Sequence, residues 1–193
     1  MRRSMVVLSL LALAALPGCA TLNQLATLQK VSFAFDRVSE VRVAGVRVSE
    51  STKFSDLGIA DAAKLAAAIA SKRLPLEAVA HVSATNPTAN GVNVRMVEMP
   101  WTLFVQDRRA LDGGIAAPVA IAAGATSDVP LTLSLDLMQL ANGGARELFD
   151  LARGIAGPSG TATELRLELR PSIETPIGPI GYPAPVVVRR TLR

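Results

Sequence analysis

The sequence predicts a mainly β protein, an antiparallel β-sandwich with one or two short helices. Two segments, 76–85 and 129–137, place leucine, alanine or valine at nearly every second position. This alternation is typical of strands with one buried and one solvated face. Turn-forming glycine, proline and asparagine separate such segments at short intervals, and only two segments have a helical period. Hydrophobic residues make up 50% of the chain and aromatic residues only 4%, so aliphatic side chains fill the predicted core.

The central segment, residues 76–105, predicts a long bulged hairpin. Asn86-Pro87 ends its first strand, because proline has no N–H for the ladder. Asn90-Gly91 supplies the positive φ angles that a reversal needs. In the second strand the apolar residues change parity, so we expect a β-bulge near Met96-Val97 to keep both apolar sets on the same core.

These motifs resemble the late embryogenesis abundant (LEA) type 2 family, which includes the WHy (water stress and hypersensitive response) domain. The resemblance rests on an alternating strand closed by Asn86-Pro87, on WTLFVQDRRALDGG after it, and on DVPLTLSL from Asp128. It covers roughly Val31 to Leu192. The resemblance implies an immunoglobulin/fibronectin-III-like sandwich without catalytic residues, and the family name implies a role in desiccation or similar stress.

The segments before the central one predict two strands and a helix. We expect strands near 30–36 and 39–49, with a β-bulge at Gly45 in the second. Residues 61–72 are rich in alanine, place Leu65 and Ile69 four apart, and follow the plausible N-cap Asp61. They predict an amphipathic helix that closes one end of the sandwich.

The segments after the central one alternate between strands and one further helix. The pattern predicts a short strand at 110–115 and a helix over 145–153 that Gly154 ends. Residues 165–169 predict a half-buried strand and residues 186–192 the last strand, with a linker at 157–160.

The first twenty residues predict a lipoprotein leader. A basic start and twelve apolar residues precede Leu-Pro-Gly-Cys, which resembles a lipobox. We expect a signal peptide over residues 1–18, cleavage between Gly18 and Cys19, and a lipid on Cys19. Residues 19–29 would be the tether and 30–193 the sandwich domain. Because Ala20 is not an aspartate, the expected location is the periplasmic face of the outer membrane; the alternative is a secreted protein with one free cysteine.

Charge argues against a nucleic-acid partner. The net charge of +4 includes Arg2 and Arg3 of the leader, so the mature chain carries only +2. The arginines near the first strands are most simply explained as solvated side chains.

The inventory of reactive groups predicts no enzyme. His81 is the sole histidine, so a histidine pair for zinc is impossible and any Ser-His-Asp triad would have to use it. It lies on the polar face of a strand, where we expect a solvated side chain. Glu164 and Glu168 are expected on the solvent-exposed face of a strand. Residues 157–160 lack the Gly-x-Ser-x-Gly spacing of a nucleophile elbow. We therefore expect no catalytic, cofactor-binding or metal-binding residue.

The expected function is that of a non-enzymatic, lipid-anchored envelope protein that binds or protects partners under desiccation or other stress. The alternative is a carrier or docking module for lipid or another apolar ligand. It is motivated by the aliphatic composition and by the small residues of 115–125, which could let two sheets part. A third possibility is an assembly subunit that donates or accepts an edge strand.

Overall fold

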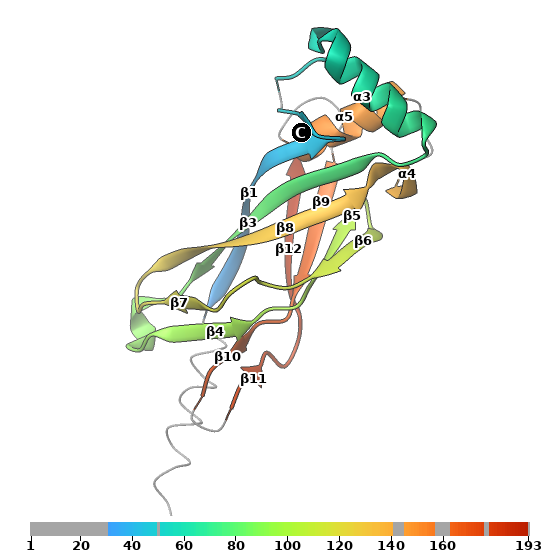
Figure 1. Ribbon diagram of the computed structural model, residues 1–193. Helices are drawn as coiled ribbons and strands as arrows, with labels where there is room; N and C mark the ends of the chain where they lie inside the picture. The colour runs from blue at the N-terminus through green and yellow to red at the C-terminus, as the bar shows by residue number, and fades with distance from the viewer. Residues whose placement is uncertain (1–30, 50, 141–144, 157–162, 176–177, 193) are drawn as a thin grey trace, which may run out of the picture.

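The computed structural model describes residues 31–49, 51–140, 145–156, 163–175 and 178–192. The predicted signal peptide, the cleavage site, the lipidated Cys19, the tether and the linker at 157–160 lie outside these residues. The described chain is mainly antiparallel β-structure, as predicted, and its strands form the two layers of a sandwich with helices at one end (Figure 1).

The first layer is a four-stranded sheet of order β2-β1-β3-β8. Its strands are β1 (Ser32–Val43), β2 (Val46–Arg47), β3 (Pro75–Thr85) and β8 (Thr126–Asp136). The alternation predicted for the central segment is confirmed, because every second side chain of β3 from Leu76 to Ala84 is buried. In β8 the residues Val129 to Leu135 alternate in the same way. The other face of this sheet carries the polar side chains.

The second layer consists of two sheets that share two bent chain segments. Their orders are β11-β10-β4-β7 and β12-β9-β5-β6. The strands are β4 (Val94–Glu98), β5 (Trp101–Val105), β6 (Arg108–Gly113), β7 (Val119–Ile121), β9 (Thr163–Leu169), β10 (Ser172–Ile173), β11 (Ile180–Gly181) and β12 (Val186–Leu192). β5 pairs with β9 and β4 with β10, so the two segments bend together between the sheets.

Proline sets this bend. Pro100 and Pro171 lie between the paired strands of the two segments, and neither can donate to a ladder. The Arg170 N–H donates to the Pro100 carbonyl oxygen at 2.9 Å, which holds the segments together across the break. Trp101 follows the bend and packs on Gly113, its ladder partner; a Cβ at Gly113 would lie 2.2 Å from the indole ring.

The predicted hairpin is wrong. β3 and β4 lie in different sheets, so the reversal after Asn86 carries the chain from one layer to the other. The β-bulge predicted near Met96-Val97 is confirmed: β10 partners Ser172 and Ile173 face Glu98 and Met96, so Val97 is the extra residue on β4. Sequence alternation reports which face is buried, and it does not report which strand is the neighbour.

The first strands also differ from the prediction. β1 is continuous, and its register shifts lie between Phe35 and Arg37 and between Ser39 and Arg42. Gly45 (φ +77°) forms, with Ala44 (φ +47°), the two-residue turn into β2, and it is not a bulge. Positive φ at both central residues is what a tight hairpin turn requires.

Helices gather at one end of the sandwich, as expected for the first of them (Figure 1). They are α3 (Ile59–Ala70), α4 (Leu137–Leu140) and α5 (Ala145–Ala156), with the 3₁₀ turns η2 (Phe54–Asp56) there and η3 (Thr88–Asn90) elsewhere. Gly58, not Asp61, is the N-cap of α3; the Asp61 carboxylate lies in the first turn and accepts from Lys64 at 2.9 Å. None of the helices in the described ranges is long and apolar enough to span a bilayer.

The second predicted helix extends past its expected end. Gly154 does not stop α5 but lies buried within it, two residues before its last residue, Ala156. An interior glycine weakens a helix by about 1 kcal/mol relative to alanine. The buried neighbours Phe149 and Ile155 offset this cost, so packing overrides local propensity.

Candidate functional site

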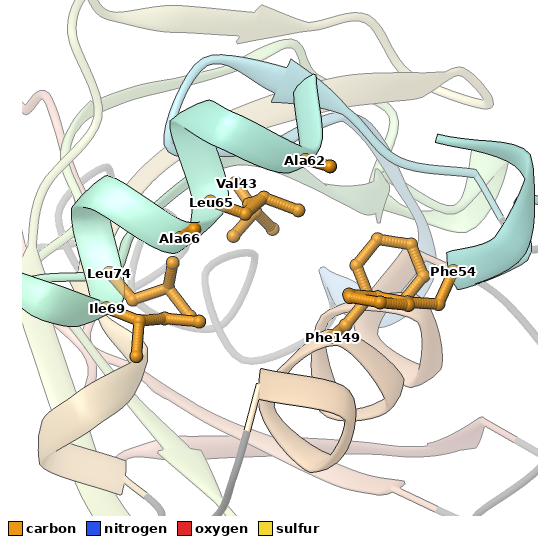
Figure 2. A pocket seen from close by; sticks show the side chains of 8 residues that line it. All are labelled: Val43, Phe54, Ala62, Leu65, Ala66, Ile69, Leu74 and Phe149. Atoms are coloured by element: carbon orange, nitrogen blue, oxygen red, sulfur yellow. The ribbon is translucent and has the colours of Figure 1, made fainter. Parts of the chain in front are cut away.

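An apolar cavity lies beneath α3 at the helical end of the sandwich (Figure 2). Its volume is about 70 Å³. Eight hydrocarbon side chains line it: Val43, Phe54, Ala62, Leu65, Ala66, Ile69, Leu74 and Phe149. Phe54 and Phe149 meet edge to face, with ring centroids 5.4 Å apart and planes at 80°. Because the lining offers no hydrogen-bonding or charged side chain, the cavity suits an apolar group and offers no reacting one.

The composition of α3 explains why this space is open. Leu65 is its one buried residue, and Ile69 is half-buried beside it. The two remaining helix residues that line the cavity, Ala62 and Ala66, have side chains too short to reach the strands beneath. The opposite face of α3 is also alanine-rich, and Ile59 at its start is 93% exposed. α3 is thus an apolar helix held by few large side chains.

His81 is not solvated as predicted, because only 12% of its side chain is exposed. Its Nε2 lies 2.8 Å from the Ser39 hydroxyl oxygen and its Nδ1 lies 2.7 Å from a carboxylate oxygen of Asp128. Arg37 approaches the same carboxylate at 3.8 Å. Ser39, His81 and Asp128 come from the neighbouring strands β1, β3 and β8, respectively. Their side chains share the outer face of the first layer.

A groove of about 260 Å³ lies beside this network, although Ser39, His81 and Asp128 are not among the residues that line it. Its lining includes Glu40, the chain neighbour of Ser39, and Val79, the register partner of Ser39. Thr132 and Ser134 of β8 form its other side. Glu40 lies in the register shift of β1 with a φ of +55°, which is uncommon for a residue with a side chain.

Asn86 of the Asn86-Pro87 motif is fully buried and ties together the loops at the end of the sandwich opposite α3. Its Nδ2 donates to the carbonyl oxygens of Val92 (2.9 Å) and Ile121 (3.1 Å), and its Oδ1 accepts from Asn90. Its backbone N–H and carbonyl pair with Ala125 and Gly124. Every polar group of this asparagine is used internally, which gives the motif a structural role.

Two ionisable groups have shifted pKa values for local reasons. A hydrogen bond from Arg109, and then one from Thr102, lowers the pKa of the Asp112 carboxyl. Burial raises the pKa of Tyr182 to about 12, and its hydroxyl donates to the Val31 carbonyl at 2.9 Å. Glu168, which the sequence placed on a wet face, contacts Arg166. None of these groups lines the apolar cavity.

The described residues contain no cluster of three or more histidine, cysteine, aspartate or glutamate side chains that could hold a metal. The expectation that the chain has no catalytic residue stays a prediction. Sequence reasoning named His81 as the only possible triad histidine but missed Ser39 and Asp128, because their contact depends on the register of three strands. It also missed the cavity, although the run of alanines opposite Leu65 and Ile69 signals a helix that fills little space.

No protein-family model matches the sequence, and no curated protein matches it either. Solved structures resemble it in fold. One is an Arabidopsis thaliana protein determined in solution, with a TM-score of 0.42 and 21% identity over 61% of this chain and 70% of that one. Another is a crystal structure from Archaeoglobus fulgidus, with a TM-score of 0.38 and 16% identity over 83% and 98% of the two chains.

A third similar structure is that of a proposed late embryogenesis abundant protein, determined in solution. Its TM-score is 0.41, with 14% identity over 98% of this chain and 88% of that one. Its name is that of the family that the sequence motifs resemble. Likeness at this level concerns the fold alone and assigns neither a ligand nor an activity to the chain.

Proposed function

We propose that this chain is a lipid-anchored envelope protein that binds the end of an apolar chain, without chemistry, in the cavity beneath α3. The observation that carries the proposal is a cavity of about 70 Å³ lined only by hydrocarbon side chains. Such a cavity excludes polar ligands, since a polar group placed there would lose its hydrogen bonds with water. It favours a saturated alkyl group, which gains about 0.8 kcal/mol for each methylene it buries.

The size of the cavity limits the ligand. An engineered apolar cavity of about 150 Å³ holds one benzene molecule, so the space beneath α3 holds a few carbon atoms. A longer chain would need α3 to move outwards. α3 is suited to such movement because Leu65 is its only buried side chain. We infer that the ligand enters by displacing this helix, with its polar head left in solvent.

The cavity lies far along the domain from the predicted lipid anchor. β1 begins where the predicted tether joins the domain, and its last residue, Val43, lines the cavity. Twelve extended residues span about 40 Å. With Cys19 in a membrane, the cavity would lie at the far end of the sandwich, where it could meet a second surface or a soluble partner (Figure 1).

Leucine substitutions that fill the cavity test whether an apolar ligand binds there. Residues 20–193 without the lipid cysteine are titrated with a fluorescent dansyl fatty acid, and native mass spectrometry identifies any ligand retained from the periplasm. Ala62→Leu and Ala66→Leu should each weaken binding about tenfold or more, because the added side chain takes the space of the ligand. Ala63→Leu is the matched control, since Ala63 lies on the exposed side of the same helix. Equal binding by all three variants would refute the site.

A second candidate function, protection of partners under desiccation, is favoured by the family motif. β3 ends at Thr85 directly before Asn86-Pro87, in the place that the resemblance implies. Ser83, Thr85, Thr126 and Thr132 face outwards and could bond partner surfaces as water is withdrawn. A model enzyme dried with this domain should keep more activity than one dried with an unrelated β-sandwich; equal losses would count against the idea.

A further inference from the structure

We propose that Ser39 is a nucleophile activated by His81 and Asp128, and that this site accepts acyl groups from activated esters. The site is separate from the apolar cavity: it lies on the outer face of the first layer, whereas the cavity lies at the helical end. A serine, a histidine and an aspartate linked in this order form the arrangement used for acyl transfer on several unrelated folds.

The direction of each hydrogen bond follows from the chemistry of the groups. An ionised aspartate only accepts, so the Nδ1 of His81 must donate to Asp128 across their 2.7 Å contact. In a neutral imidazole the other nitrogen, Nε2, then carries the lone pair. The Ser39 hydroxyl therefore donates to Nε2 across 2.8 Å, which is the direction required for a general base.

The strands of the first layer hold Ser39, His81 and Asp128 in contact. The three side chains project from adjacent paired strands, so no loop has to close to assemble them; the β3–β8 ladder is unbroken around His81, whereas β1 shifts register next to its pairing with His81. Because the imidazole is 12% exposed, water competes little for either nitrogen. Arg37, which also contacts Asp36, lies 3.8 Å from the Asp128 carboxylate on the same face.

Room for a substrate lies beside Ser39, in a groove that Ser39 itself does not line. The groove of about 260 Å³ begins at the chain neighbour and the ladder partner of Ser39, Glu40 and Val79. Glu40 has a positive φ within a register shift, and strained backbone of this kind gathers at functional sites. The groove is open to water, so a developing negative charge would be stabilised less than in a dry pocket. This favours esters with good leaving groups over amides.

The reaction has two balanced steps. The Ser39 oxygen bonds to the ester carbonyl carbon while its proton moves to Nε2 of His81; the bond to the leaving oxygen then breaks, and the released alcohol takes that proton. In the second step water attacks the acyl-serine and gives a proton to Nε2, which returns it to the Ser39 oxygen as the acid leaves. No cofactor is needed.

The test uses the full chain, purified in detergent and mixed with 4-nitrophenyl acetate. We expect a burst of 4-nitrophenol and an acetyl group on the peptide that contains Ser39, detected after acid quenching. Ser39→Ala should abolish both, and His81→Gln should slow acetylation about 100-fold, the typical contribution of a general base. Ser83→Ala is the control, because Ser83 lies on the same face and its hydroxyl bonds the Ala34 carbonyl instead of His81. Acetylation that persists in Ser39→Ala would overturn the proposal.

A second measurement on the unsubstituted protein guards against variants that fail to fold. His81 is the only histidine, so its two ring nitrogens give one unambiguous pair of ¹⁵N signals. The proposal requires the neutral tautomer with the proton on Nδ1. Protonation on Nε2 would leave Ser39 without a base and would refute the proposal, whatever the variants do.

Discussion

The two ends of this sandwich are built on different physical principles. At the Asn86 end, defined here as residues 86–93 and 121–125, hydrogen bonds fix the backbone, and the buried Asn86 side chain alone bonds Val92, Ile121 and Asn90. At the helical end, defined as η2, α3 and α5, apolar contacts hold the elements and leave a cavity. Hydrogen bonds are directional and fail when displaced, whereas apolar contacts tolerate small shifts.

This difference shows where the protein can adapt. A loop pinned by buried amide bonds has one arrangement, because each alternative leaves a buried polar group unpaired. A shift of the alanine-rich helix α3 over its cavity would displace only apolar contacts and would leave no lining polar group unpaired. We therefore expect the helical end to receive ligands and the Asn86 end to serve as the rigid base of the sandwich.

The largest effect should come from Asn86→Asp, which replaces the amide donor with a carboxylate of nearly the same shape. The Val92 and Ile121 carbonyls would lose their donor and face a negative charge in a buried site. Leaving buried groups unpaired costs about 1–3 kcal/mol each, so the free energy of unfolding should fall by about 4 kcal/mol. Denaturant unfolding measures this loss.

The matched control is Asn93→Ala. Asn93 lies in the same loop and also bonds a backbone group, the Ala123 N–H, but at an exposed position. Its loss should cost less than about 1 kcal/mol because water replaces the acceptor. Equal losses for the two variants would mean that the Asn86 end is not held by its buried amide.

Leu65→Ala should have a smaller and more local effect. Removing the one buried side chain of α3 costs about 2 kcal/mol, the low end for leucine, because the site already adjoins a cavity. Amide exchange of α3 should accelerate more than exchange of β3. Should both elements accelerate equally, α3 would be part of the cooperative core and the contrast between the ends would fail.

The sequence predicts the faces of the strands well and their partners poorly. Period-two alternation identified the buried sides of β3, β8 and β9 because burial acts on each residue through its own side chain. The hairpin assigned to 76–105 failed because pairing depends on distant segments: β3 pairs with β1 and β8, and β4 pairs with β7 and β10.

The candidate sites depend on such distant pairings even more. His81 contacts Asp128 only because it lies opposite Pro130 in the β3–β8 ladder, and it reaches Ser39 only because β1 is shifted in register nearby. Alternation places all three on an outer face but gives no register. The cavity, in turn, needs the position of Phe149 relative to α3, which no local pattern encodes.

Tyr182 gives the smallest and most specific test, at the start of β1 beside the Asn86 end, where Ser32 pairs with Thr85. This sole tyrosine packs edge to face on Phe33, donates to the Val31 carbonyl, and has its pKa raised by burial from 10 to about 12. Since the folded state holds its proton more tightly than the unfolded state, the contribution to stability is complete below pH 10 and is lost as the pH rises towards 12. For a half-exposed phenol we expect a loss of about 1 kcal/mol, less than the shift alone implies. Phenolate absorbance measures the pKa of Tyr182 directly. Tyr182→Phe should remove the part of the stability loss at high pH that comes from ionising this phenol. Ionisation of Tyr182 near pH 10 would show that its side chain is not buried against Phe33 and Val31.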